Sequence, residues 1–123
     1  MEKVCHLLHE LGIGRTYRGY YYLATAIHLV MEEEDRLLHI HKCLYQEIAF
    51  LYNTTPYCVE RDIRTVKTHF WNSENRDRLD TITGFPIKQV PSNSEFITII
   101  SRYLQKENIS ILRTKKGLMD LNP

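Results

Sequence analysis

Apolar residues recur at intervals of three and four along most of this 123-residue chain. The clearest run is Val59, Ile63, Val66 and Phe70, which places one apolar stripe along about four turns of helix. This run predicts a helix over residues 56–71. Because the same helical spacing dominates the rest of the sequence, we expect an all-α fold.

Five further segments complete the predicted architecture. Residues 19–31 are apolar around most of the helix circumference, which predicts a central helix buried on several sides. Residues 92–95 form a capping box at the start of a last helix. We expect a compact bundle of about six helices over residues 1–107, and a tail over 108–123 that either docks on the bundle or frays. The remaining predicted helices are residues 2–11, residues 37–52 with a break near Leu44, and residues 76–83.

The size and composition of the chain exclude several classes of protein. A domain of this length buries roughly two-thirds of the surface of its unfolded chain, so it needs no disulfide or metal to fold. Its three cysteines are odd in number and far apart, which indicates reduced thiols. No segment approaches the ~18 to 20 apolar residues of a membrane span, and no signal-peptide run follows Met1. We therefore expect a cytoplasmic protein.

No motif in the sequence points to catalysis or to a cofactor. There is no phosphate-binding glycine loop, nucleophile elbow or pair of carboxylates at catalytic spacing. His6 with His9, and His39 with His41, are potential metal ligands, but a zinc site needs about four converging ligands and neither group has the paired spacing. We expect no enzyme, no cofactor and no metal site.

Residues 45–64 have the composition of a helix-turn-helix. Ala49 is small where two short helices would cross, and Asn53 tolerates the positive φ that the turn requires. Thr55 can cap the second helix, and Pro56 suits its first position. An ordinary helical corner has the same pattern, so both interpretations stay open. The residues of 37–52 that we expect to face the core are Ile40, Leu44, Ile48, Leu51 and Tyr52.

Burying the apolar stripe of residues 56–71 turns a polar face outward. Arginine can bind guanine through two hydrogen bonds and glutamate can accept one from cytosine N4, so this face suits reading of bases in the major groove. Three further residues belong to the predicted DNA-binding residues: the capping Thr55, and Arg102 and Lys106, which we expect to reach the DNA backbone. The outward residues are Tyr57, Cys58, Glu60, Arg61, Arg64 and Thr65.

The formal net charge of +1 is low for a nucleic-acid binder, but a total says nothing about its distribution. Residues 102–116 contain five basic side chains against Glu107, a charge of +4, whereas residues 32–35 carry a charge of −4. The charges of these two segments cancel in the total, so the small net charge is compatible with a molecule that has one basic side. We expect specificity to rest on a few residues of one helix.

Short blocks of sequence, spaced almost without gaps over about residues 4–107, carry a resemblance to a known family. The blocks are His9–Ile13, Gly19–Tyr20, Tyr22–Leu23, Leu44–Tyr45, Ile48–Ala49, Asn53–Thr55, Val59–Arg61, Ile63–Arg64, Trp71 and Asn93–Ile97. In them the chain resembles the C-terminal DNA-binding effector domain of the sporulation master regulator, the stage zero sporulation protein A family. The resemblance implies a six-helix domain whose recognition helix, here about residues 56–71, enters the major groove of a promoter box that often occurs in tandem. It also implies that the domain activates or represses transcription, and that Glu60, Arg61 and Arg64 face DNA.

The chain departs from this family at positions that bear on function. Cys58 replaces an arginine that reads the promoter box, and Thr65 replaces a histidine. Losing one guanine contact removes about 1–3 kcal/mol of discrimination, so the resemblance does not fix the target sequence. Arg78, Asp80 and Thr83 replace a serine, a serine and a phenylalanine of the surface that in the family touches the RNA polymerase sigma factor.

The resemblance leaves the partners and two functions open. The family carries an N-terminal receiver domain that these 123 residues do not contain, which is consistent with an excised piece or with a free-standing relative lacking a phosphorylation switch. Double-stranded DNA is the expected partner, and the sigma factor and a second copy of the chain on DNA are further ones. The alternative function is a protein-interaction module that binds the full-length regulator or RNA polymerase and has lost specific DNA recognition.

Overall fold

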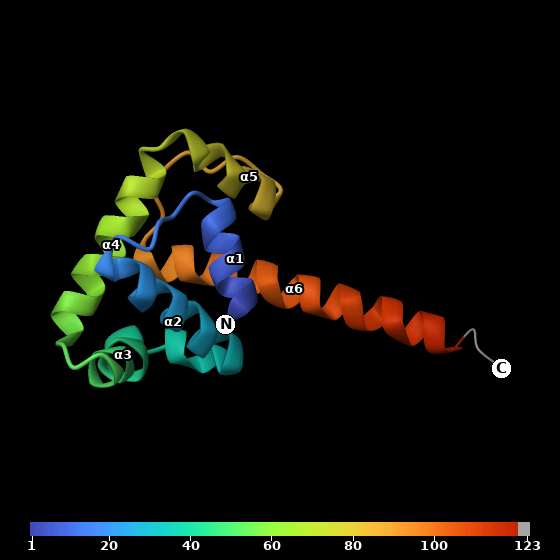
Figure 1. Ribbon diagram of the computed structural model, residues 1–123, viewed down its shortest axis with the longest axis horizontal. Helices are drawn as coiled ribbons and strands as arrows, with labels where there is room; N and C mark the ends of the chain where they lie inside the picture. Colours follow the sequence, from blue (N-terminus) through green and yellow to red (C-terminus); the bar gives the residue numbers. More distant parts are fainter. Residues whose placement is uncertain (121–123) are drawn as a thin grey trace.

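Six α-helices build this computed structural model, which describes the backbone of residues 1–120 and the side chains of residues 1–108. Among the described residues no strand occurs, so the predicted all-α class is confirmed. Three shorter turns connect the helices: the 3-10 turns η1 (Glu34–Leu37) and η3 (Glu74–Arg76), and the π-helical turn η2 (Ile40–Tyr45). The helices, drawn in Figure 1, are α1 (Glu2–Glu10), α2 (Arg18–Glu32), α3 (Gln46–Leu51), α4 (Pro56–Trp71), α5 (Asp77–Thr83) and α6 (Asn93–Asp120).

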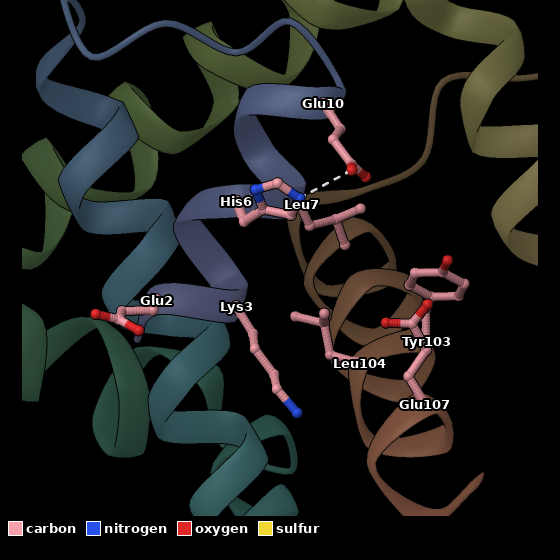
Figure 2. A pocket seen from close by; sticks show the side chains of 8 residues that line it. All are labelled: Glu2, Lys3, His6, Leu7, Glu10, Tyr103, Leu104 and Glu107. Carbon is pink, nitrogen blue, oxygen red and sulfur yellow. Dashed lines mark ion pairs between the residues drawn. The ribbon is translucent and has the colours of Figure 1, made fainter. Parts of the chain in front are cut away.

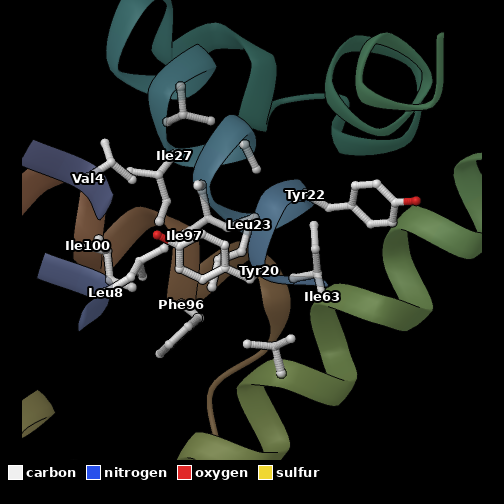
Figure 3. Packing of buried hydrophobic residues seen from close by; sticks show 14 of the residues in the cluster. Val4, Leu8, Tyr20, Tyr22, Leu23, Ile27, Ile63, Phe96, Ile97 and Ile100 are labelled. Atoms are coloured by element: carbon white, nitrogen blue, oxygen red, sulfur yellow. The ribbon is translucent and has the colours of Figure 1, made fainter. Parts of the chain in front are cut away.

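The hydrophobic core forms around α2, as the sequence predicted. Leu23 and Ile27 of α2 are fully buried. Phe96 and Ile97 of α6 lie beside α2, and Ile63 of α4 points toward α2 as well (Figure 3). The packing of α4 and α6 against one central helix fixes which side of α4 is buried and which side meets solvent.

Gly19 sets the close approach of α2 to α4. A Cβ atom at this position would lie 2.0 Å from the backbone oxygen of Asp62 and 2.5 Å from a methyl carbon of Val66. No side chain fits in that space, because real Cβ atoms keep well over 3 Å from such neighbours. The first turn of α2 is therefore packed directly on the middle of α4.

Residues 34–52 differ from the prediction, which was one helix over residues 37–52 with a break near Leu44. They form η1, then η2, and only then the regular helix α3. Arg36 ties η1 back to its neighbours, since it donates to the backbone oxygen of Leu29 at 2.6 Å and pairs with Glu47 at 3.1 Å. The prediction that Leu51 faces the core was wrong, since Leu51 is 58% exposed at the end of α3. Tyr52 is 40% exposed but does reach the core, because its hydroxyl lies 2.7 Å from the Thr25 hydroxyl and its ring centre 5.3 Å from that of Tyr22.

The last helix is longer than we expected. Its start is as predicted, since the backbone N–H of Glu95 donates to Ser92 Oγ at 3.1 Å and Glu95 accepts from the backbone of Ser92 at 3.5 Å. From Asn93 it continues past residue 108 to Asp120 as one helix, and Figure 1 shows its last turns projecting beyond the other helices. The domain boundary at 107 stays a prediction, and residues 121–123 of the predicted tail lie outside the described residues.

Candidate nucleic-acid interface

The turn between α3 and α4 is built from the residues that the sequence indicated. Asn53 takes the left-handed conformation with φ 54°, and the backbone N–H of Thr54 donates to the oxygen of Ala49 at 2.9 Å. Thr55 caps α4, because its hydroxyl accepts from the backbone N–H of Cys58 at 3.2 Å, and Pro56 occupies the first turn. The predicted roles of these residues in the turn are confirmed.

One side of α4 is anchored in the core. Val59, Ile63, Val66 and Phe70 are all buried, as their spacing predicted. Lys67 is buried as well, which the sequence analysis missed although the residue lies four positions after Ile63 on the same side. Burial lowers the pKa of its ammonium group, and the nearby Arg64 acts in the same direction.

The opposite side of α4 carries the predicted polar residues. Arg61, Arg64 and Thr65 are exposed, and Tyr57 is 67% exposed at the first turn. Glu60 and Cys58 are half-buried along the same helix. The structure thus brings six of the nine predicted site residues onto one face, with Thr55 at the start of the helix as a seventh.

Both arginines of this face have acidic partners on α4. Arg64 donates to Glu60 at 2.8 Å, and Arg61 donates through Nε to Asp62 at 3.2 Å. The guanidinium carbon of Arg61 also lies 5.7 Å from the centre of the Tyr57 ring. These contacts stabilise the charged form of Arg61 and raise its pKa, chiefly through the hydrogen bond with Asp62. They also restrict the side chains before any ligand arrives.

Two smaller side chains complete the face. The Thr65 hydroxyl donates to the backbone oxygen of Arg61 at 3.0 Å, which leaves its lone pairs to accept. The Cys58 thiol lies beside the hydroxyls of Thr55 and Thr54, and hydrogen bonds with them lower the pKa of Cys58. A thiol at this position cannot make the two-donor contact that an arginine makes with guanine.

The structure does not bring Arg102 and Lys106 to this face. Arg102 pairs with Glu34 of η1 at 2.9 Å. Lys106 lines a groove with Ile82 and Gly84 at the end of α5. The side chains of the other basic residues that we predicted to form this basic side, from residue 113 on, lie outside the described side chains.

One histidine near the N-terminus has an acidic partner. His6 pairs with Glu10 at 3.0 Å beside the groove between α1 and α6 (Figure 2). Within the described part of the chain no three side chains of the ligand types come together.

An exposed apolar side chain near the turn was not predicted as part of the site. Phe50 lies on the last turn of α3, two residues before the C-cap residue Tyr52, and is 87% exposed. Its type and position in the predicted pair of helices were visible in the sequence, but its orientation depends on where α3 ends.

The arrangement as a whole has the layout of a small helical DNA-binding domain, in which one helix is fixed on its apolar side and free on its polar side. A family model described as Sporulation initiation factor Spo0A C terminal matches residues 4–104. The chain belongs to this family, so the resemblance found in the sequence blocks is confirmed. It is a family of DNA-binding domains of transcription regulation in sporulation, not of enzymes.

No helix in the described part of the chain has the length and apolar character that crossing a membrane requires.

Proposed function

We propose that α3, the turn at Asn53 and α4 act as a helix-turn-helix, and that α4 reads a promoter box in the major groove of double-stranded DNA. The observation that carries this proposal is the row formed by the exposed Arg61 and Arg64 and the half-buried Glu60, on a helix whose opposite side is buried. A helix fixed in this way presents its side chains in one register, which sequence reading requires.

The ion pairs of the face suggest how bases would be selected. Arg64 and Glu60 lie one helical turn apart and already share two hydrogen bonds, at 2.8 and 3.1 Å. On DNA, Arg64 would exchange this partner for guanine O6 and N7, and Glu60 would then accept from an adjacent cytosine N4. Arg61 keeps its Nε on Asp62 and offers its two Nη groups to a base edge or a phosphate.

The test is a panel of promoter-box duplexes and scrambled duplexes, titrated at several salt concentrations. We expect a dissociation constant that depends on both sequence and salt, because phosphate contacts release counterions. A constant that depends on neither would refute the proposal. The R64A change should weaken binding by about 1–3 kcal/mol at boxes with guanine at one position and relax specificity there.

The R61A change decides between two roles of Arg61. A loss confined to one base position assigns Arg61 to a base edge, and an equal loss on every duplex assigns it to a phosphate. Arg76→Ala is the matched control, because it removes the same charge from a different element, η3. The guanidinium carbon of Arg76 lies 4.8 Å from the centre of the Trp71 ring.

Binding to tandem boxes is the oligomeric part of the proposal. Two copies of the chain on adjacent boxes would give two successive retarded bands, and a single box would give one. Cooperative filling of the two boxes would show contact between the two copies on DNA.

A second candidate function rests on Cys58, which stands where the family has a base-reading arginine. In this alternative the domain binds the full-length regulator or RNA polymerase and does not read DNA. The surface of α5 that would meet the sigma factor contains Arg78, which donates to the backbone oxygen of Glu10 and so is tied to α1. Co-purification with either partner together with no retarded DNA band would favour this function over the first.

A further inference from the structure

A narrow groove of about 260 Å³ lies beside the exposed face of α4. Residues 16–19, where the chain enters α2, form one wall of the groove, and Arg61, Asp62, Thr65 and Val66 of α4 form the other. Two residues of the proposed base-reading face, Arg61 and Thr65, thus belong to this groove as well. The segment of the chain that borders α4 here is thus the end of the loop before α2 together with the first two residues of α2.

The position of this segment follows from the contact at Gly19. Because Gly19 sits on the backbone of Asp62, the residue before it must lie at the rim of the groove. That residue is Arg18, and its side chain is exposed. Among the residues whose side chains are described, Arg18 forms no ion pair, whereas Arg61 and Arg64 both do.

The polar groups of the groove suit an anion with several oxygen atoms. Arg18, Arg61 and the exposed Thr16 all line the groove, and their side chains carry two guanidinium groups and a hydroxyl. The carboxylate of Asp62 is mostly buried and already accepts from Arg61 at 3.2 Å, so it offsets one of the two positive charges. One positive charge is left for an incoming group, which matches the single negative charge of a phosphodiester.

The polar edge continues along α4 beyond the groove. The Tyr17 hydroxyl lies 3.4 Å from His69 Nε2, and the two rings are 5.2 Å apart. His69 is an exposed residue near the end of α4. The loop before α2 and the exposed side of α4 therefore form one continuous polar surface.

We infer that this groove binds a backbone phosphate of the DNA duplex next to the bases that α4 reads, with Arg18 as its main contact. The inference rests on the proposed function, since it needs α4 in the major groove. A phosphate held at the start of α2 would fix the register and the angle of α4 on the duplex, without any contribution to base preference. Arg18 is accordingly a positioning residue for DNA recognition.

The test compares Arg18→Ala with the unchanged chain on the box duplex and on a scrambled duplex, at four or more salt concentrations. We expect the dissociation constant to rise by roughly three- to tenfold on both duplexes, with an unchanged ratio between them. The slope of log K against log salt should fall in magnitude by about 0.9, the value for one lost phosphate contact. Arg18→Lys should restore most of the slope, and Arg76→Ala should leave slope and affinity unchanged.

Several results would overturn the inference. If Arg18→Ala binds like the unchanged chain while the unchanged chain still prefers its box, Arg18 makes no contact and the proposed function survives. A loss limited to one base position would make Arg18 a base reader and refute the phosphate role. If the unchanged chain binds no duplex, the proposed function itself fails and the inference fails with it. Far-UV circular dichroism checks that each variant is folded.

Discussion

Replacing Gly19 by alanine tests the contact on which both the fold and the interface depend. The added methyl group would meet the Asp62 oxygen at 2.0 Å and the Asp62 carbonyl carbon at 2.7 Å, and both are backbone atoms that cannot rotate away. The helices α2 and α4 must therefore move apart. Over-packing of a core costs about 1–3 kcal/mol, and the upper value applies because backbone is displaced.

The net effect of this change is smaller than the clash, because alanine favours helix over glycine by at most ~1 kcal/mol. We expect a loss of about 2 kcal/mol in the free energy of unfolding, which lowers the melting temperature by roughly 8 °C at about 4 °C per kcal/mol. Urea and thermal unfolding followed by circular dichroism measure both quantities. A melting temperature equal to or above that of the unchanged chain would refute the reasoning.

The matched control for this change is Gly14→Ala. A Cβ atom at Gly14 would meet only the Thr16 hydroxyl, at 3.7 Å, which is an ordinary contact. Since its backbone does not have positive φ, alanine should be neutral or should stabilise the domain by about 0.4–1 kcal/mol through the unfolded state. Gly14→Ala should also bind DNA as the unchanged chain does, whereas Gly19→Ala should bind more weakly because α4 is displaced from the loop before α2.

Two further predictions concern the start of α4. Thr55→Ala removes the cap on Cys58 N and should cost about 1 kcal/mol of stability, measured by urea unfolding, whereas Thr55→Ser should retain the cap. Hydrogen bonds from threonine hydroxyls lower the pKa of Cys58, so more thiolate forms at a given pH near neutrality and alkylation should be faster than at a model thiol. Box DNA should protect Cys58 from iodoacetamide but not the exposed Cys43, as followed by mass spectrometry; equal labelling of Cys58 with and without DNA would contradict its place in the interface.

Local signals in the sequence were sufficient to predict α4 with its bounds. The stripe from Val59 to Phe70 gave the buried side, and Thr55 and Pro56 gave the first turn. Each signal acts over at most four residues, so no distant contact is needed to interpret it. The ion pair between Glu60 and Arg64 is of the same local kind, since it joins residues one turn apart.

The features that we missed depend on how the elements meet. Apolar spacing does not distinguish a π-helical turn from an α-helical one, so η2 was absorbed into one predicted helix. The length of α6 was missed because apolar periodicity, which we used to end the helix, reports burial rather than helix formation. The chain from Ser92 to Lys116 contains no glycine or proline that would stop a helix.

The surroundings of two arginines also depend on how the elements meet. Arg102 was expected at the DNA backbone because of its charge, but its partner Glu34 is 68 positions away in the sequence and no local pattern relates them. Arg18 was not considered, because only the packing of Gly19 on Asp62 brings the start of α2 beside α4. Net charge over a segment indicates how many cations it has, and the fold decides which of them share a face.

The charge arrangement also bears on how strongly one copy of this domain can bind DNA. Arg18, Arg61 and Arg64 are the arginines that the structure places on or beside the exposed side of α4. If all three contacted phosphates, the salt slope would be only about −2.7, against the steeper slopes of proteins with 6–10 phosphate contacts. Raising salt from 50 to 200 mM would then cost about fortyfold in affinity, and nonspecific binding would be weak throughout. Glu60 and Asp62 already pair with two of these arginines, so under the proposed function they would lower affinity for wrong sequences more than for a box that offers Glu60 a cytosine. Under the proposed function, such a domain would obtain discrimination from base contacts on α4 and affinity from a second copy on a tandem box, so a total charge near zero is compatible with sequence-specific binding.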